Sequence, residues 1–189
     1  MDACFDPIPV KPGETWMVPG GLPHAIGGGI LMVEVMEPSD LVVRCEFERE
    51  GMTVPPGGRF MGRSLDFCLE VFDYADYTVA DIGRQFRLTP TRLASEPGWV
   101  VDRLVGSERT SCFEICRIQA DRRGRWSNDG RCALAIMTRG SGAVSVGGEQ
   151  LPLKFGESCF VAAASEGVSL APGAPGSELL LCQPAAMGL

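Results

Sequence analysis

The sequence predicts an all-β protein with one short helical insertion. Short apolar runs recur at intervals of roughly 8–12 residues, the spacing of a β-sandwich or barrel. The 24 glycines and 14 prolines lie throughout the chain and separate these runs as turns. Apolar residues adopt helical spacing only between about residue 64 and residue 86. At 189 residues, the chain has room for one large domain or two small ones.

Three strands are expected in the first region of the chain, over residues 8–21, 27–38 and 40–50. The middle segment is apolar on both faces, which places it in the interior of a sandwich or barrel. Glu37 and Asp40 fall at the turn after it, where an aspartate side chain can bond the backbone.

Two short helices are expected next. The first begins after Ser64, a suitable N-cap, and its apolar residues recur at i, i+3, i+4 and i+7: Leu65, Cys68, Leu69 and Phe72. The second begins at Thr78, which forms a capping-box pattern with Asp81.

The strand pattern returns at about residue 97 and continues to the C-terminus. Gly147-Gly148 is the expected turn of one hairpin, and residues 171–177 are expected to form a loop. We therefore expect three parts: residues 1–60 as a partial β-barrel, residues 61–96 as a helical connection, and residues 97–189 as a C-terminal β-domain.

Charge and hydropathy exclude several classes of partner. The net charge of −7 and the pI of about 4.8 argue against a nucleic-acid surface and against an anionic membrane. Residues 78–94 superficially resemble a helix-turn-helix, but the acidic chain lacks the basic footprint that phosphates require. No run of 18 apolar residues is present, so no membrane-spanning helix is expected.

The cysteines indicate a reducing compartment. Most of the eight lie within apolar runs and are expected to be small buried residues rather than a disulfide framework. Cys112 and Cys116 form a Cys-x-x-x-Cys pair, but no second pair accompanies them as a zinc site would need. With no basic and apolar leader at the N-terminus, a cytoplasmic location is predicted.

A glycine–proline–histidine motif occupies residues 13–24. Gly13 is followed after five residues by Pro19-x-Gly21, and after two more by His24. Gly13 is expected to turn the chain into a strand, and the Pro-x-Gly element to shape the exit of that strand.

The same frame returns more weakly at residues 156–167. Alanines replace the proline and the second glycine, and Gly167 stands in place of the histidine. This echo predicts a second barrel that has no metal ligand.

The motif resembles the second conserved motif of the cupin superfamily, which implies a double-stranded β-helix, or jelly roll. Cupins carry a first motif upstream, with two further histidines and a glutamate. Here only twelve residues precede Gly13, and His24 is the single histidine. The first barrel is therefore expected to be partial, with sheet edges covered by a missing N-terminal half or by a homodimer partner.

The residues around His24 are similar to the signature of type I mannose-6-phosphate isomerases: VPGGLPHAIGGGILMVEVMEPSDLVVR. The resemblance is strong over residues 8–50 and covers roughly the second half of a short family member. It implies a phosphosugar substrate, and interconversion of mannose 6-phosphate and fructose 6-phosphate by metal-assisted proton transfer once the active site is complete.

Carried over residue by residue, the resemblance makes His24 a zinc ligand, Glu34 a carboxylate lining the active site, and Arg44 the arginine that steadies the substrate. A positioned carboxylate suits acid–base work, and a guanidinium stabilises the developing negative charge. The family's other zinc ligands, a Gln-x-His pair and a glutamate, lie upstream and have no counterpart here. The Tyr-Asp pair common after the arginine is replaced at residues 45–46.

Structural alternatives exist for the same residues. Glu34 is alternatively a buried ion-pair partner of Arg44, and Arg44 is alternatively an exposed strand residue paired with Glu46. For the whole chain, the alternative is a non-catalytic degenerate cupin that acts as a sugar-binding, small-molecule-binding or oligomerisation module.

Overall fold

The computed structural model describes residues 6–39, 42–49, 51–146, 148–165 and 167–186. The chain divides into two compact units, Met1–Leu88 and Thr89–Leu189. Strands dominate the second unit, so the predicted all-β class is confirmed. Within the described ranges, no helix combines the length and the apolar character needed to cross a membrane.

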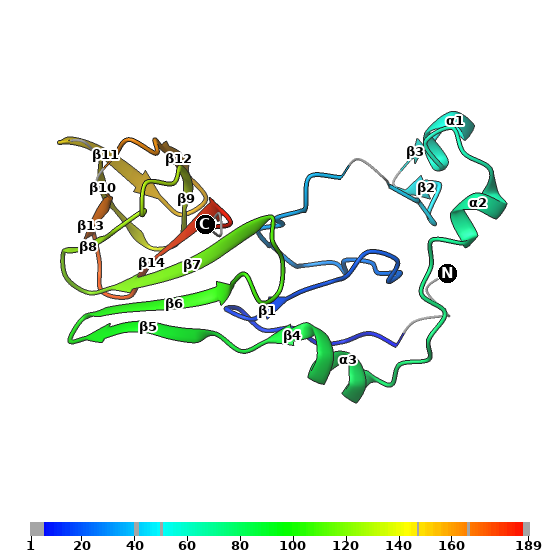
Figure 1. Ribbon diagram of the computed structural model, residues 1–189, viewed down its shortest axis with the longest axis horizontal. Helices are drawn as coiled ribbons and strands as arrows, with labels where there is room; N and C mark the ends of the chain where they lie inside the picture. The colour runs from blue at the N-terminus through cyan, green and yellow to red at the C-terminus, as the bar shows by residue number, and fades with distance from the viewer. Residues whose placement is uncertain (1–5, 40–41, 50, 147, 166, 187–189) are drawn as a thin grey trace. The chain divides into compact units, whose positions relative to one another are not determined.

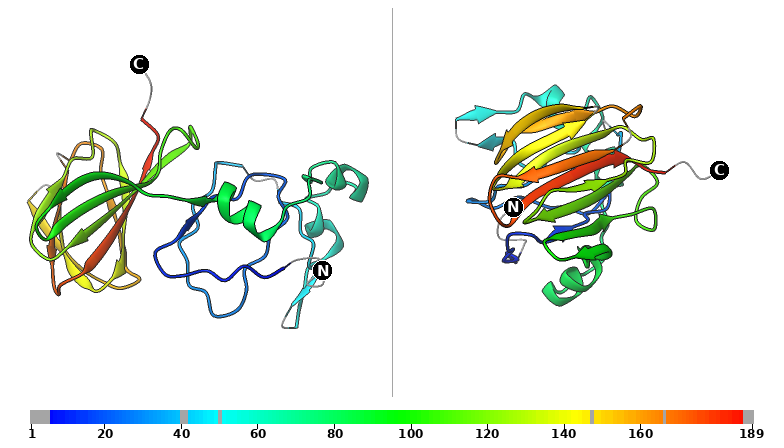
Figure 2. Two further views of the ribbon diagram at one scale, coloured as in Figure 1. Left: turned by 90° about the horizontal axis from the view of Figure 1, so that it is seen from below. Right: turned by 90° about the vertical axis from the view of Figure 1, so that its left-hand side faces the viewer.

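The second unit is a sandwich of two antiparallel sheets (Figures 1 and 2). Its strands are β5 (Thr91–Glu96), β6 (Trp99–Val105), β7 (Phe113–Ala120), β8 (Gly124–Trp126), β9 (Ala133–Arg139), β10 (Ser141–Val146), β11 (Glu149–Lys154), β12 (Ser158–Val161), β13 (Val168–Pro172) and β14 (Ser177–Pro184). One sheet has the order β12-β9-β14-β7-β6-β5 and the other the order β11-β10-β13-β8.

The core lies between these two sheets. Successive residues of a strand point to opposite faces, so alternate residues of β7 and β14 face the interior. Cys116 and Ile118 of β7 and Leu179 and Leu181 of β14 are fully buried there. Burial of each large aliphatic side chain stabilises the unit by about 1.5–3 kcal/mol.

The last three strands of the unit depend on strands that precede them in the chain. Strand β12 pairs with β9, β13 pairs with β10 and β8, and β14 lies between β7 and β9. Among the described residues, no two of β12, β13 and β14 pair with each other. A segment that contained only these three strands would therefore have no ladder to form.

The first unit contains short elements: β1 (Thr15–Trp16), β2 (Glu48–Arg49), β3 (Met52–Thr53), α1 (Pro56–Arg59), α2 (Leu65–Leu69), α3 (Val79–Phe86) and β4 (Arg87–Leu88). The predicted helix starts are confirmed. The hydroxyl of Ser64 accepts a hydrogen bond from the Phe67 N–H (3.2 Å), and Thr78 and Asp81 form the complete capping box. Helix α2 ends at Leu69, before the last residue of its predicted apolar stripe.

The three strands predicted over residues 8–50 are not formed, and that prediction is wrong for this chain. The described residues of that region are in strand only at Thr15–Trp16 and Glu48–Arg49, and Asp40 lies outside the described residues. The carbonyl of Glu37 accepts a bond from the Ser39 N–H (2.6 Å), as a turn requires. Thr15–Trp16 pairs with β4 and Glu48–Arg49 pairs with β3, and the remaining described residues of the region are not in strand.

The second unit also begins earlier than the sequence suggested. Residues 91–96 form β5, which pairs with β6 and so belongs to the sandwich rather than to a helical connection. Because strand β5 begins at Thr91, residues 78–94 do not form a helix-turn-helix. Val146 pairs with Glu149, as the predicted hairpin requires, although Gly147 itself lies outside the described residues.

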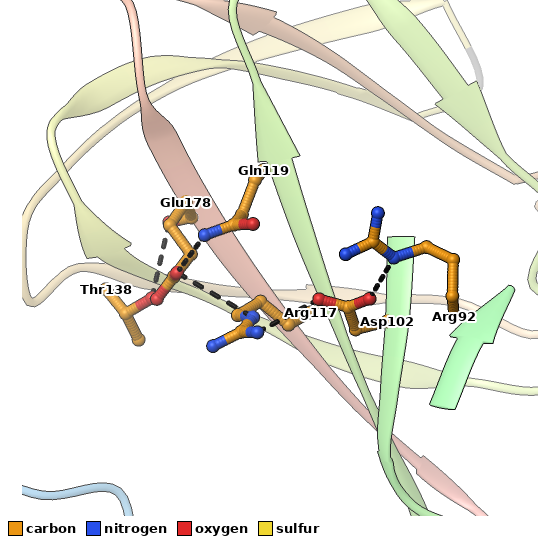
Figure 3. A network of polar contacts seen from close by, with 6 residues as sticks. All are labelled: Arg92, Asp102, Arg117, Gln119, Thr138 and Glu178. Carbon is orange, nitrogen blue, oxygen red and sulfur yellow. Dashed lines mark hydrogen bonds and ion pairs between the residues drawn. The ribbon is translucent and has the colours of Figure 1, made fainter. Parts of the chain in front are cut away.

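A network of ion pairs and hydrogen bonds ties together the outer face of the six-stranded sheet (Figure 3). Asp102 accepts bonds from Arg92 (2.5 Å) and Arg117 (2.9 Å), although its side chain is only 3% exposed. Further along, Glu178 accepts bonds from Thr138 (2.7 Å) and Gln119 (3.3 Å). Burial alone would raise the pKa of Asp102, but the bonds from Arg117 and Arg92 outweigh it and lower that pKa.

We predict that Asp102→Asn lowers the free energy of unfolding by about 2–3 kcal/mol at neutral pH, because Arg117 loses its nearer carboxylate (2.9 Å) and keeps only the more distant Glu178 (3.9 Å). The folded-state pKa of Asp102 is lowered, so its contribution is present above the unfolded-state pKa of about 3.9 and is lost as the pH falls through the lower folded value. Urea denaturation from pH 7 downwards should show the two proteins converging in acid. Glu96→Gln, which breaks an exposed pair with Arg122, should change stability by less than about 0.5 kcal/mol. A stability difference between Asp102→Asn and the unmodified protein that does not vary with pH would contradict the lowered pKa of Asp102.

Candidate functional site

His24 is exposed at the end of the glycine–proline–histidine motif. Its Nδ1 lies 3.0 Å from the carbonyl oxygen of Leu22. A carbonyl oxygen can only accept, so this contact is a hydrogen bond in the tautomer that has its proton on Nδ1, and in that neutral tautomer the lone pair lies on Nε2. Metal-binding histidines are commonly held in this way, with the second ring nitrogen bonded to a carbonyl group.

Glu34 and Arg44 are also exposed. Arg44 is held by its own loop, since its Nη1 donates to the carbonyl oxygen of Gly58 (2.8 Å) and its backbone N–H to that of Arg59 (3.1 Å). Neither structural alternative is observed, because Glu34 is not buried and Glu46 lies near Arg49 instead (3.8 Å). In the described part of the chain, no hydrogen bond or ion pair joins His24, Glu34 and Arg44.

The start of the motif is held by a turn that occurs twice in the chain. In the first unit, the Glu14 carboxylate accepts from the Lys11 N–H (3.1 Å), and the Glu14 N–H donates to the Lys11 carbonyl (3.2 Å). In the second unit, Glu157 and Lys154 make the same two bonds at 2.8 and 2.9 Å. The glycine between each pair has a φ of 86° or 85°, a left-handed conformation that favours glycine.

Glu14 also organises the surroundings of β1, which sequence reasoning missed. Its carboxylate accepts from the indole N–H of Trp16 (3.2 Å) and from Arg87 (3.3 Å). The bond from the Lys11 N–H is the largest of the effects that lower the pKa of Glu14. The Gly-Glu dipeptide that occurs in both copies of the motif was the sequence feature that could have indicated this role of Glu14.

The second copy of the motif ends in a closed site. Gly167 is buried, and a Cβ at this position would collide with the carbonyl oxygen of Trp126. Asn128, which is 2% exposed, occupies the same end of the sandwich. Its side-chain amide donates hydrogen bonds to the carbonyls of Arg131 (2.9 Å) and Ala162 (3.3 Å). No histidine side chain has room here, so the second unit presents no counterpart of His24.

The residues present do not make a complete metal site. Zinc in proteins takes four ligands from nitrogen, sulfur and oxygen donors. No group of three or more His, Cys, Asp and Glu side chains within the described ranges is arranged to hold a metal ion. His24 by itself would supply one of the four ligands of such a site.

The cysteines do not add to the donor set. The seven in the described ranges are free, and Cys4 lies outside those ranges. Burial raises the pKa of Cys116 to about 12, so its thiol stays protonated near neutral pH. Burial also raises the pKa of Cys159 and Cys182. These residues are parts of the packed sheet rather than ligands or nucleophiles.

An open groove of about 440 Å³ lies beside α3, away from the predicted site residues. Trp16, Arg84 and Arg87 are among its lining residues. Arg84 is paired with Asp81 and Arg87 with Glu14, so the guanidinium charges at the groove are balanced. The groove therefore has no charge preference that would identify a ligand.

Comparison with known proteins relates the chain to one enzyme family. No family model matches it. Over 157 residues the chain is 28% identical to the mannose-6-phosphate isomerase of Streptococcus mutans, a match that covers 82% of this chain and 45% of that protein. The chain thus spans less than half the length of this relative. The relationship to mannose-6-phosphate isomerases inferred from the motif is confirmed.

Solved structures give weaker similarities. The mannose-6-phosphate isomerase of Bacillus subtilis is 14% identical, with a TM-score of 0.47, over 72% of this chain and 37% of that one. An RmlC-like cupin of Shewanella frigidimarina is 16% identical, with a TM-score of 0.42, over 61% of this chain and 93% of that one.

We predict that the residues that end the two motif copies, His24 and Gly167, cannot be exchanged. Gly167→His should lower the stability of the protein by about 1–3 kcal/mol, through the collision with Trp126 and the φ of 135°, and should bind no zinc. The reciprocal change His24→Gly should alter stability by less than about 0.5 kcal/mol, because this side chain is exposed. Urea denaturation and zinc analysis after dialysis would check both. A Gly167→His protein of unchanged stability that retained zinc would contradict the closed-site assignment.

Proposed function

We propose that this chain, a relative of the mannose-6-phosphate isomerases, provides the histidine-bearing half of an isomerase active site. In this proposal His24 is a zinc ligand, Glu34 serves acid–base chemistry, and Arg44 binds the phosphosugar. The complete site interconverts mannose 6-phosphate and fructose 6-phosphate. The observation that carries the proposal is the contact of His24 Nδ1 with the Leu22 carbonyl at 3.0 Å, because the neutral tautomer that makes this bond has its lone pair on Nε2.

Each residue has a role suited to its chemistry. The zinc, when bound, polarises a sugar oxygen as a Lewis acid. A carboxylate at position 34 moves a proton between neighbouring carbons of an aldose and a ketose. The Arg44 guanidinium is already fixed through Gly58, so it meets developing negative charge with little loss of rotamer freedom.

The further zinc ligands come from an N-terminal half, present either upstream in the same protein or as a separate chain. The single histidine and the match to less than half of the S. mutans protein support this part of the proposal. The free cysteines in the described ranges suit a reducing, cytoplasmic setting, which we include in the proposal.

A non-catalytic sugar-binding or oligomerisation module is the second candidate. The closed end of the second barrel favours it, because Asn128 and Gly167 show that one copy of the motif has already lost the geometry of a metal site. The two candidates differ in whether zinc is bound once the upstream half is supplied.

We predict that the chain alone holds no stoichiometric zinc and that, with the upstream half added, one zinc is bound per complex and isomerase activity appears. Glu34→Gln should lower kcat by roughly 10²–10⁴-fold and leave the zinc content unchanged. His24→Ala should remove both zinc and activity. Metal analysis and a coupled assay of fructose 6-phosphate formation would measure these effects.

Glu48→Gln provides a control in the same region, because Glu48 is an exposed residue of β2 and has no role in the proposed chemistry. Its zinc content and kcat should match those of the unmodified complex. Full activity in the His24→Ala complex, or a complex that folds but holds no zinc, would reject the isomerase and leave the binding module.

A further inference from the structure

We propose that Tyr77 and Asp73 are positioning residues for His24. Both belong to residues 71–77, the bracing segment between α2 and α3, which holds the turn that leads from β1 to the histidine. The inference rests on the proposed function in that it takes His24 as the zinc ligand. Its test measures the imidazole ring and the backbone of this chain directly, and is therefore independent of zinc and of activity.

The motif approaches the bracing segment closely at Gly21. The Asp73 N–H donates a hydrogen bond to the carbonyl oxygen of Gly21 (2.8 Å). Gly21 has a φ of 86°, and a Cβ at this position would lie 2.6 Å from the carbonyl oxygen of Val71. A side chain here would therefore strain the backbone and push the bracing segment away. The glycine of the Pro-x-Gly element is thus required by this contact as well as by its own turn.

The side chains of Asp73 and Tyr77 fix the conformation of the bracing segment. The Asp73 carboxylate accepts hydrogen bonds from the Tyr77 hydroxyl (2.6 Å) and from the Ala75 N–H (2.9 Å). The bond from Tyr77 is the largest of the effects that lower the pKa of Asp73, so the carboxylate stays ionised near neutral pH. The same bond raises the pKa of Tyr77, which keeps the hydroxyl protonated as the donor. These bonds hold the turn from which the Asp73 N–H reaches Gly21.

Tyr77 also connects the bracing segment to the beginning of the motif. Its ring packs edge-on against Phe86 at the end of α3, with the centroids 5.5 Å apart and the planes at 74°. The carbonyl oxygen of Phe86 accepts a hydrogen bond from the Met17 N–H (2.8 Å), next to the β1–β4 pair. Tyr77 therefore contacts both residues that anchor the motif, Phe86 at Met17 and Asp73 at Gly21.

His24 lies directly after this braced turn. The Leu22 N–H donates to the carbonyl oxygen of Pro19 (3.2 Å), and the Leu22 carbonyl oxygen lies 3.0 Å from Nδ1 of His24. That contact is a hydrogen bond in the tautomer with its proton on Nδ1. The position of the Leu22 carbonyl therefore favours one tautomer of the imidazole, and Leu22 follows the Gly21 anchor by one residue. Outer partners of metal-binding histidines act in this way, by fixing the tautomer and the ring orientation.

Tyr77→Phe tests the brace, because it removes the hydroxyl and keeps the ring that packs on Phe86. His24 is the single histidine, so ring-nitrogen NMR of the intact chain reports on one imidazole. In alkaline buffer, where the ring is neutral, the folded chain should hold more of the Nδ1-protonated tautomer than the chain unfolded in urea. Tyr77→Phe should lower the ratio of the Nδ1-protonated to the Nε2-protonated form about fivefold. It should also speed amide exchange at Asp73 by roughly tenfold.

Tyr74→Phe is the matched control from the same segment. The Tyr74 hydroxyl donates to the carbonyl oxygen of Leu69 (2.7 Å), a residue of α2 and not one of the two anchors. Its removal should leave the tautomer ratio and the exchange at Asp73 unchanged. An unchanged ratio in Tyr77→Phe, or an equal shift in Tyr74→Phe, would overturn the inference. A rise in exchange throughout α3 that equals the rise at Asp73 would overturn it as well.

Zinc binding separates this inference from the proposed function. In the complex with the upstream half, Tyr77→Phe should weaken zinc binding by about tenfold, and Tyr74→Phe should leave it unchanged. A complex that holds no zinc in the unmodified protein would reject the proposed isomerase. The tautomer ratio and the exchange at Asp73, measured on this chain alone, would still decide whether Tyr77 and Asp73 position His24.

Discussion

Backbone pairing is the constraint on which the rest of this protein depends. In the second unit, the final strands are held only by strands that come earlier in the chain, and those earlier strands lie within the same unit. The sandwich is therefore self-sufficient, with its apolar residues buried between two sheets. The first unit has a segment of similar pattern, but in its described residues the ladders are the two-residue pairs β1–β4 and β2–β3. Of its described residues, the buried hydrophobic side chains are Cys68 and Leu88. The two segments are alike in sequence pattern and in local turn geometry. The difference in burial between the two units therefore arises from which β-ladders each unit can complete.

This constraint separates what the sequence could predict from what it could not. The starts of α2 and α3 were predictable because the bonds of Ser64 and Thr78 span three residues. The strands of the sandwich were predictable because their partners are present. The strands of residues 8–50 were predicted from the same kind of short apolar runs between turn residues, but a strand exists only in a sheet, and its partner is non-local. Strand β5 was missed because residues 91–96 are mostly exposed at an edge and have no strong apolar pattern.

The candidate site was likewise only partly predictable from the sequence. The motif identified His24, and the structure adds that its Nδ1 is engaged by Leu22. The loss of a ligand at Gly167 was also visible in the sequence. The filling of that end of the barrel by Asn128 was not, because its bonds reach Arg131 and Ala162 from separate elements. The shared site expected for His24, Glu34 and Arg44 stays a prediction, since in the described part of the chain His24 contacts Leu22 and Arg44 bonds Gly58, and no bond joins the three.

The largely exposed run of residues 30–36 has a consequence for the chain in solution. Short apolar segments of high β-propensity and low charge are the ones that assemble into intermolecular cross-β aggregates. In this run, Glu34 is the single charge, and Pro38 closes the segment with a residue that cannot donate to a ladder. Both are of the kind that act as gatekeepers against such assembly. The carboxylate proposed for proton transfer would thus also keep the unassembled protein from aggregating, which gives selection two separate reasons to retain an acidic residue at that position.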